Sequence, residues 1–250
     1  MIRVLIIIFI SMSLKANLLE RDDVKKFIDL AVEESNLTRE EIIDYIKDAQ
    51  PSPKAVELRS NQPEVKATWD DYRSKRVTDT RILNGVNFIN ENADIFNKVE
   101  KDYGVSKFYI ASIIGLETNY GGYLGSFNPL DTIFTRAFDP DSKFWQRELV
   151  ELLVLSKRYG LNPKEIKSSW SGAIGLGQFI PSSYNAYGVD YDYDGYVDLL
   201  NSRMDGIASV ANFLKVHGWN SNQPAAAQVA LSEQYSNCLL YTSPSPRDSN

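Results

Sequence analysis

A single carboxylate near the end of an apolar helix is the first group in this sequence that could do chemistry. Glu117 is expected to share one helical face, at spacings of three and four residues, with Ile110, Ile113 and Ile114. A carboxyl group on an apolar face loses hydration, and one near a helix C-terminus meets the unfavourable end of the helix dipole. Because both effects favour the protonated form, we predict that Glu117 acts as a general acid.

A second segment, residues 169–184, combines glycines with polar side chains. Its glycines permit close backbone approach. Hydroxyl and amide groups on Ser169, Gln178 and Tyr184 are suited to hydrogen-bonding sugar hydroxyls and acetamido groups. Taken alone, the segment is equally compatible with a glycine-rich helix start that is broken at Pro181.

A third segment alternates aspartates with tyrosines and has a glycine at its sixth position, as at the start of a calcium-binding EF-hand loop. Hard oxygen ligands suit Ca²⁺ rather than a transition metal. The twelfth position is Asn201 instead of the usual glutamate, and Asp205 is the best substitute. The alternative is a solvated acidic turn with Asp205 as a helix cap. The predicted ligands of a structural Ca²⁺ are Asp190, Asp192, Asp194, Tyr196 and Asp205.

Composition excludes several other chemistries. The chain has one cysteine, Cys238, and one histidine, His217, so a thiolate or histidine metal centre is excluded and a Ser-His-Asp triad is disfavoured. His217 directly precedes Gly218, where a histidine commonly ends a helix. The net charge of −6 and the lack of a basic run argue against a nucleic-acid partner.

Helical patterns run throughout and predict a mainly α fold. We expect an N-terminal helical segment at 17–79, with a capping box at Thr38 and a connector over 50–63, followed by a catalytic core at 80–237. The core is expected to contain a long amphipathic helix from Thr80 to Gly104, the Glu117 helix, and helices near 145–159 and 205–217. No alternating strand pattern is evident.

The two ends of the chain differ from its body. Residues 1–16 have a positive start, an apolar run and a small residue at Ala16, as in a secretory signal peptide. No cysteine follows for lipid attachment, so we expect an exported protein without a stable membrane anchor. Residues 238–250 resemble translated sequencing adapter and are interpreted as a non-native tail, with the C-terminus truncated before it.

The order and spacing of the Glu117-Thr-Asn-Tyr-Gly and Gly172-Ala-Ile-Gly-Leu-Gly-Gln-Phe-Ile-Pro motifs resemble the B-type lytic murein transglycosylases. The resemblance covers residues 23–220 and implies a lysozyme-like helical core, an EF-hand-like loop at 190–205, and a periplasmic monomer acting on peptidoglycan glycan strands. It implies Glu117 as the catalytic acid/base. The implied substrate-binding residues are Ser169, Gln178, Tyr120 and Tyr184.

The implied reaction cleaves the β-1,4 bond between N-acetylmuramic acid and N-acetylglucosamine and forms 1,6-anhydromuramic acid. Two departures stand out: Phe213 replaces a frequent tyrosine, and residues 140–143 replace a Pro-Arg-Arg run. A hydrolytic muramidase is one alternative, with Asp131 or Asp139 as a second carboxylate. A non-catalytic wall-binding or calcium-binding module is the other.

Overall fold

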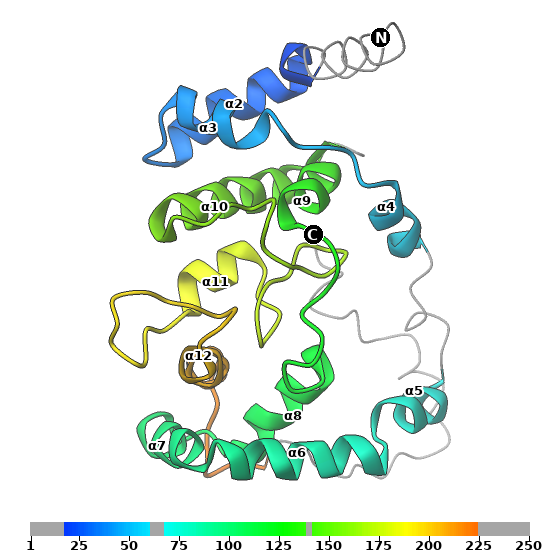
Figure 1. Cartoon of the computed structure of the whole chain (residues 1–250), viewed down its shortest axis with the longest axis vertical. Helices are drawn as coiled ribbons and strands as arrows, with labels where there is room; N and C mark the ends of the chain where they lie inside the picture. Colours follow the sequence, from blue (N-terminus) through cyan, green and yellow to red (C-terminus); the bar gives the residue numbers. More distant parts are fainter. Residues whose placement is uncertain (1–17, 61–67, 139–141, 225–250) are drawn as a thin grey trace, which may run out of the picture. The chain divides into compact units, whose positions relative to one another are not determined.

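The computed structural model describes residues 18–60, 68–138 and 142–224 (Figure 1). The chain divides into two units, Met1–Trp219 and Asn220–Asn250, and every helix named below belongs to the first. The expected signal peptide and non-native tail lie outside the described residues. Among the residues described, the ordered secondary structure is helical apart from isolated bridge pairs, which confirms the mainly α prediction.

The helices are α2 (Asp22–Glu34), α3 (Arg39–Ile46), α4 (Pro53–Ser60), α5 (Trp69–Arg76), α6 (Asp79–Glu91), α7 (Ala93–Tyr103), α8 (Lys107–Thr118), α9 (Pro129–Phe138), α10 (Lys143–Tyr159), α11 (Pro181–Tyr187) and α12 (Arg203–Val216). None of them, within the described ranges, is both long and apolar enough to cross a lipid bilayer.

The N-terminal helices follow the expected signals. The capping box at Thr38 is present, because its hydroxyl accepts from the Glu41 amide and the Glu41 carboxylate accepts from the Thr38 amide. The apolar face of α2 is buried through Val24, Phe27 and Ile28, and α2 packs against α3 and α10. The predicted boundary at 79/80 stays a prediction.

The structure corrects two helix predictions. The expected connector over 50–63 contains α4, with Pro53 at its start, where a proline's missing amide hydrogen costs nothing. The expected helix from Thr80 to Gly104 is divided at Asn92 into α6 and α7. The buried Asn92 side chain donates from Nδ2 to the Phe88 carbonyl oxygen at 2.7 Å, so it satisfies a carbonyl at the end of α6.

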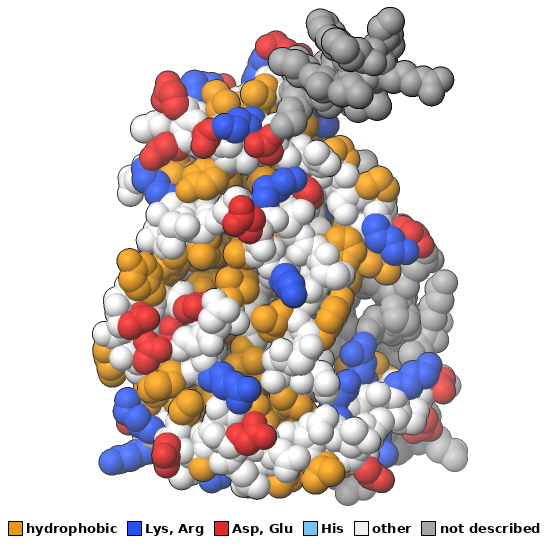
Figure 2. Space-filling model, in the orientation of Figure 1, with side chains coloured by type: hydrophobic (Ala, Val, Ile, Leu, Met, Phe, Trp, Pro, Cys, Tyr) orange, Lys and Arg blue, Asp and Glu red, His pale blue; other side chains and the backbone are white. Residues whose placement is uncertain are grey.

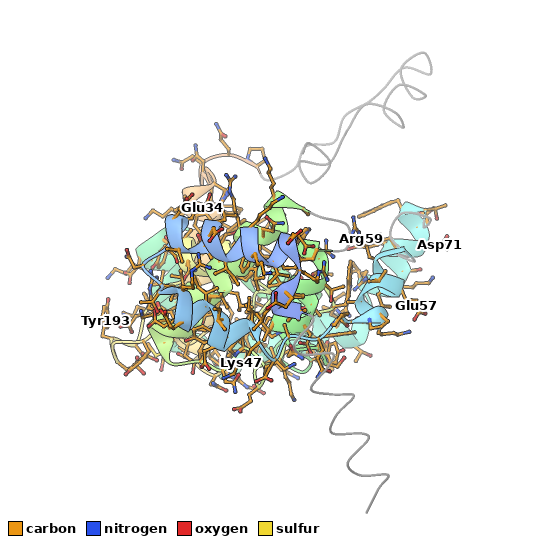
Figure 3. The ribbon with its side chains drawn as sticks, turned by 90° about the horizontal axis from the view of Figure 1, so that it is seen from above. Glu34, Lys47, Glu57, Arg59, Asp71 and Tyr193 are labelled. Carbon is orange, nitrogen blue, oxygen red and sulfur yellow. The ribbon has the colours of Figure 1, made fainter. Side chains whose placement is uncertain are left out.

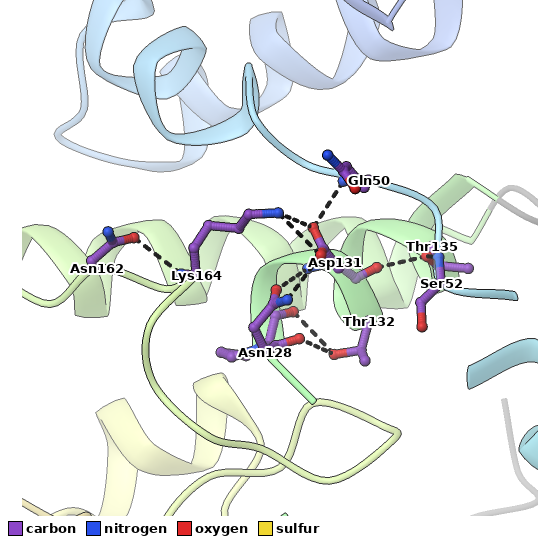
Figure 4. Close-up of polar contacts among 9 residues, drawn as sticks. Gln50, Ser52, Asn128, Asp131, Thr132, Thr135, Asn162 and Lys164 are labelled. Atoms are coloured by element: carbon purple, nitrogen blue, oxygen red, sulfur yellow. Dashed lines mark hydrogen bonds and ion pairs between the residues drawn. The ribbon is translucent and has the colours of Figure 1, made fainter. Parts of the chain in front are cut away.

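Residues 50–52 are fastened to α9 by polar contacts (Figure 4). The Asp131 carboxylate accepts from the Gln50 amide at 2.8 Å, and the Ser52 amide donates to the Thr135 hydroxyl at 2.8 Å. Lys164 pairs with Asp131 at 2.8 Å. These contacts set where α4 begins and account for its packing on α9.

The helices that carry the predicted site belong to two groups, and the helices within each group pack against one another. Helix α8 packs against α6, α7 and α12, while α10 packs against α9 and α11. The main hydrophobic core draws on both groups, with Ile110 and Ile114 from α8 and Leu149 and Leu152 from α10 all fully buried. On the face drawn in Figure 2, basic and acidic side chains are interspersed.

Candidate active site

Helix α8 carries Glu117 at its next-to-last position. The helix starts at the expected cap, where the Ser106 hydroxyl accepts from the Phe108 amide, and it ends at Asn119, whose φ of 50° is left-handed. The side buried by the helix consists of Ile110, Ala111, Ile114, Gly115 and Thr118. Glu117 itself is exposed. The prediction that its own helix removes it from water is therefore wrong, because Thr118 takes the inward position at this turn.

The Thr118 hydroxyl joins the end of α8 to the glycine-rich segment. It donates to the Leu176 carbonyl oxygen at 3.0 Å, within reach of the Ile114 carbonyl at 3.1 Å, and it accepts from the Gly121 amide at 3.0 Å. A Cβ on Gly121 would lie 3.2 Å from the Leu176 side chain, so the backbone at 121 is close to this segment as well. The two motifs predicted to form one site are thus brought together.

The Tyr120 side chain lies between α6 and the end of α8. Its hydroxyl donates to the Arg81 carbonyl oxygen at 3.0 Å. A Cβ added to Gly85 or Gly115 would lie 2.6 or 2.5 Å from that hydroxyl, so both glycines leave room for the ring. Because its proton is donated to α6, the hydroxyl is not free to donate to a sugar. The hydroxyl oxygen can still accept, so the predicted substrate contact of Tyr120 stays a prediction.

Residues 168–179 form a compact loop that folds back on itself twice. Phe127 pairs with Ser168, Ser168 with Ile174, and Ile174 with Phe179 as isolated antiparallel bridges. The Ser169 hydroxyl accepts from the Ala173 amide at 3.1 Å and lies 2.9 Å from the Ser171 hydroxyl. Ser169 and Ser171 are both half-buried, so part of each residue reaches the surface of the loop.

Gln178 adopts a left-handed backbone conformation, with φ of 52°. A non-glycine residue in this region is uncommon and is often kept for a functional reason. Its amide nitrogen Nε2 donates to the Gly175 carbonyl oxygen at 3.0 Å, which fixes the side chain. The side-chain oxygen keeps acceptor capacity, and the residue is half-buried.

Tyr184 is a core residue, contrary to the sequence-based prediction of a substrate contact. Its side chain is 2% exposed. The hydroxyl donates to the Val197 carbonyl oxygen at 2.8 Å and accepts from the Leu199 amide at 3.0 Å. Burial raises its pKa, so the group stays protonated in this position. Tyr184 therefore fastens the acidic loop to α11.

The acidic loop brings three of the predicted metal ligands together. Carboxylate oxygens of Asp190, Asp192 and Asp194 lie within 4.8 Å of one another. Gly195, with φ of 96°, permits the turn that follows. This donor set consists of hard oxygens at the first, third and fifth loop positions, and it fits Ca²⁺. Tyr196 follows at the seventh position and is exposed.

The structure places Asp205 outside this group of three. Its side chain is fully buried, and its two carboxylate oxygens accept from the Tyr191 and Asp198 amides, each at 2.8 Å. Asp205 thus holds the backbone of the loop from inside. Asn201, at the twelfth position, donates to the Asp198 carboxylate at 3.0 Å.

The alternative second carboxylate has a structural role where the structure describes it. Asp131 accepts from Gln50, from Asn128 and from Lys164, and only 17% of its side chain is exposed. Asp139 lies outside the described residues. Sequence reasoning missed α9, which carries Asp131, and it missed Thr118, whose hydroxyl lies on the buried face of a strongly apolar helix.

A helical fold, with a glutamate at the end of a helix that is joined to a glycine-rich loop, is the arrangement expected for a transglycosylase domain. The family model of the transglycosylase SLT domain matches residues 20–247, so the chain belongs to this family.

Individual relatives agree with this assignment. The chain is 33% identical over 208 residues to membrane-bound lytic murein transglycosylase B of Escherichia coli K12, covering 79% of this chain and 57% of that protein. It therefore spans less than two thirds of that relative. An Escherichia coli lytic transglycosylase solved in complex with calcium matches with a TM-score of 0.74 at 32% identity, covering 82% of this chain and 66% of that one.

A second similar structure contains a bound muropeptide. Pseudomonas aeruginosa SltB3, in complex with NAG-NAM-pentapeptide, matches with a TM-score of 0.74 at 29% identity. The alignment covers 86% of this chain and 57% of that one.

Proposed function

We propose that this chain is a lytic transglycosylase that cleaves the β-1,4 bond between N-acetylmuramic acid and N-acetylglucosamine in peptidoglycan. The observation that carries the proposal is the Thr118 bond to Leu176, because it joins the end of the helix that carries Glu117 to the loop that carries Ser169 and Gln178. Family membership supports the same reaction class.

In this proposal Glu117 works alone, first as acid and then as base. It protonates the glycosidic oxygen, and its carboxylate then takes the proton from the muramoyl C6 hydroxyl as that oxygen attacks C1. The product is a 1,6-anhydro ring. Because the nucleophile belongs to the substrate, positioning supplies much of the rate and no water has to be activated.

Because Glu117 is exposed, a bound substrate would change the hydration of its carboxyl group. In the protein alone the side chain faces solvent. A glycan seated over the end of α8 would exclude water from the carboxyl group, and loss of hydration favours the protonated acid. The dipole of α8 acts in the same direction.

The test is a digest of purified sacculi, with products separated and weighed by mass spectrometry. We expect anhydro-muropeptides from the parent chain. Glu117→Gln should lower the rate by about 10²- to 10⁴-fold, the range of general acid–base catalysis. Glu33→Gln is the matched control, since Glu33 is also an exposed glutamate one residue before a helix end.

The products also test the alternatives. Reducing ends in place of anhydro ends would mean a hydrolytic muramidase. Binding to sacculi without any products, unchanged by Glu117→Gln, would mean a non-catalytic module. Either result would contradict the proposed reaction.

We further propose that Asp190, Asp192 and Asp194 bind a structural Ca²⁺, together with Tyr196 at the seventh loop position. The convergence of the three carboxylates supports the site. When bound, the ion would neutralise their mutual repulsion and stabilise the loop after α11. In this arrangement Asp205 orients the loop backbone and is not a fifth ligand.

The setting in which the chain works is part of the same proposal. We propose export directed by residues 1–16 and action in the periplasm as a monomer on glycan strands. The substrate lies outside the cytoplasm, which supports export. The name of the Escherichia coli relative describes that protein as membrane-bound.

A further inference from the structure

Tyr123 is an aromatic side chain that the proposed reaction does not use. It follows Glu117 by six residues, and its side chain is 61% exposed. Single exposed aromatic rings are common on protein surfaces, so the exposure alone indicates no function. Two further observations set Tyr123 apart: the place where its backbone is anchored and the way in which its ring is held.

The backbone of Tyr123 is anchored to the end of α8. Its amide donates to the Thr118 carbonyl oxygen at 2.9 Å, and Thr118 is the residue directly after Glu117. The Gly122 amide donates to the Asn119 carbonyl oxygen at 3.2 Å. The chain therefore turns back as soon as α8 ends, and this turn brings Tyr123 close to the residue that follows the proposed acid.

The same segment also runs along the glycine-rich loop of the proposed site. A Cβ on Gly121 would lie 3.2 Å from the Leu176 side chain, and a Cβ on Gly125 would lie 1.9 Å from the Ser168 carbonyl oxygen. Tyr123 is the residue midway between these two close approaches. It therefore lies where the helix that carries the acid meets the loop that carries the polar side chains of the site.

The ring of Tyr123 is held at its hydroxyl end, while its faces are left without a ring or cation partner. The hydroxyl donates to the Ser126 hydroxyl oxygen at 3.2 Å. Among the described residues, no aromatic ring and no cation pairs with the Tyr123 ring. Other exposed aromatic side chains do have a ring partner, namely Trp69 with Tyr72, Tyr109 with Trp219 and Phe144 with Trp145.

We infer that Tyr123 is a stacking platform for a sugar ring of the glycan strand, next to the bond that Glu117 would cleave. The inference rests on the proposed function for the identity of the ligand. A pyranose ring presents C–H groups on its faces, and such groups pack on the negative face of an aromatic ring. Because the Tyr123 hydroxyl is already bonded to Ser126, the ring loses little freedom when a sugar covers it.

The inference is tested by glycan binding to a protein that does not turn over. In a Glu117→Gln background, calorimetry with Ca²⁺ present measures the Kd of a peptide-free tetrasaccharide of alternating N-acetylglucosamine and N-acetylmuramic acid. Tyr123→Ala should raise this Kd by about 3- to 10-fold, the loss expected for one aromatic contact. Tyr123→Phe should keep the Kd of the background protein, since the ring remains and only the hydroxyl bonded to Ser126 is lost. Tyr193→Ala is the control, because Tyr193 is an exposed tyrosine of the acidic loop (Figure 3).

A fluorescence measurement shows whether the sugar covers this position. Tyr123→Trp in the Glu117→Gln background places an indole where the tyrosine ring lies. Its emission, taken as the difference from the background protein, should change when the tetrasaccharide is added, and the change should saturate with the Kd found by calorimetry. Tyr193→Trp should give no such change. A residue with a purely structural role would not report the ligand in this way.

Several outcomes would overturn the inference. An unchanged Kd in Tyr123→Ala, or an emission of Tyr123→Trp that does not respond to the tetrasaccharide, would show that no sugar lies on this ring. Equal weakening by Tyr123→Ala and Tyr123→Phe would assign the effect to the hydroxyl instead of the ring face, and thermal unfolding checks that each variant is folded. The proposed function fails separately, if the parent chain releases no anhydro products from sacculi although tetrasaccharide binding still depends on Tyr123.

Discussion

Ser182 donates twice to the buried carboxylate of Glu148, from its amide at 3.0 Å and from its hydroxyl at 2.6 Å. This pair fastens the start of α11 to α10, and Glu148 is 3% exposed. Burial raises the pKa of Glu148, and the two bonds from Ser182 oppose the shift in part. An acid of this kind makes stability depend on pH.

We expect Glu148→Gln to flatten that dependence. A raised pKa in the folded state contributes stability below the unfolded value of 4.5, and this contribution is lost as pH rises through the folded value. The glutamine keeps an acceptor for the Ser182 amide but does not ionise. Urea unfolding at pH 4 to 8 should therefore favour the variant increasingly as pH rises. A difference in unfolding free energy that is independent of pH would contradict the assignment.

Thr118→Val should impair the site more than its small change in volume suggests. The valine cannot donate to the Leu176 carbonyl, and an unsatisfied buried acceptor costs about 1–3 kcal/mol. We expect a loss of this size in the free energy of unfolding and about a tenfold lower kcat, since Glu117 would shift relative to the loop.

Thr132→Val is the matched control for Thr118→Val. Thr132 is equally buried, but the bonds of its hydroxyl to described residues go to the Asn128 and Pro129 carbonyl oxygens at the start of its own helix. Its kcat should stay near that of the parent. Equal kcat values for the two variants would show that the Leu176 bond does not position the site.

Gly125→Ala should be strongly destabilising. A Cβ at this position would lie 1.9 Å from the Ser168 carbonyl oxygen, and φ is 103°. The backbone would have to open the pairing of Phe127 with Ser168, at a cost of about 2–4 kcal/mol. Gly160→Ala, at φ of 63° with nothing within 4 Å, should cost only about 1 kcal/mol. Similar losses of unfolding free energy for both would contradict the close approach.

Calcium should raise the melting temperature of the parent chain and not that of Asp194→Ala. A ligand at 100 times its Kd stabilises the folded state by about 2.7 kcal/mol, so a chelator should reverse a measurable shift. Asp70→Ala, on the exposed face of α5, is the control. Calorimetric titration should show one site in the parent. A parent chain with neither heat nor a thermal shift at millimolar Ca²⁺ contradicts the proposal.

Sequence periodicity predicted most helices because their apolar faces are regular and their caps are local. Ser106 and Thr38 are examples of caps that need no tertiary information. Asn92 is different, since the apolar pattern continues across it and the break depends on a side chain that turns back to Phe88. Helix α9 was missed because nearly every residue from Pro129 to Phe138 is buried, so no polar face marks its period.

The candidate site was predictable in its residue types but not in its burial. Glu117 was predicted to be removed from water, but it is exposed. Tyr184 was predicted to contact the substrate, but it is buried in the core. Both outcomes depend on contacts with distant segments, Leu176 for α8 and Val197 for Tyr184. Neither contact can be predicted from the periodicity of the sequence. The three aspartates were found together because their spacing is local.

The attachment of residues 50–52 to α9 bears on the order in which the protein assembles. The amide of Gln50 and the carboxylate that receives it are 81 residues apart, and the Ser52 and Thr135 groups are 83 apart. During synthesis Gln50 leaves the ribosome long before Asp131 exists, so its amide remains bonded to water until α9 is made. Contacts of such long range close late in folding. Helix α4, which follows these residues and packs on α9, should thus gain protection of its amide protons only after α9 has formed, as pulsed hydrogen exchange during refolding would show.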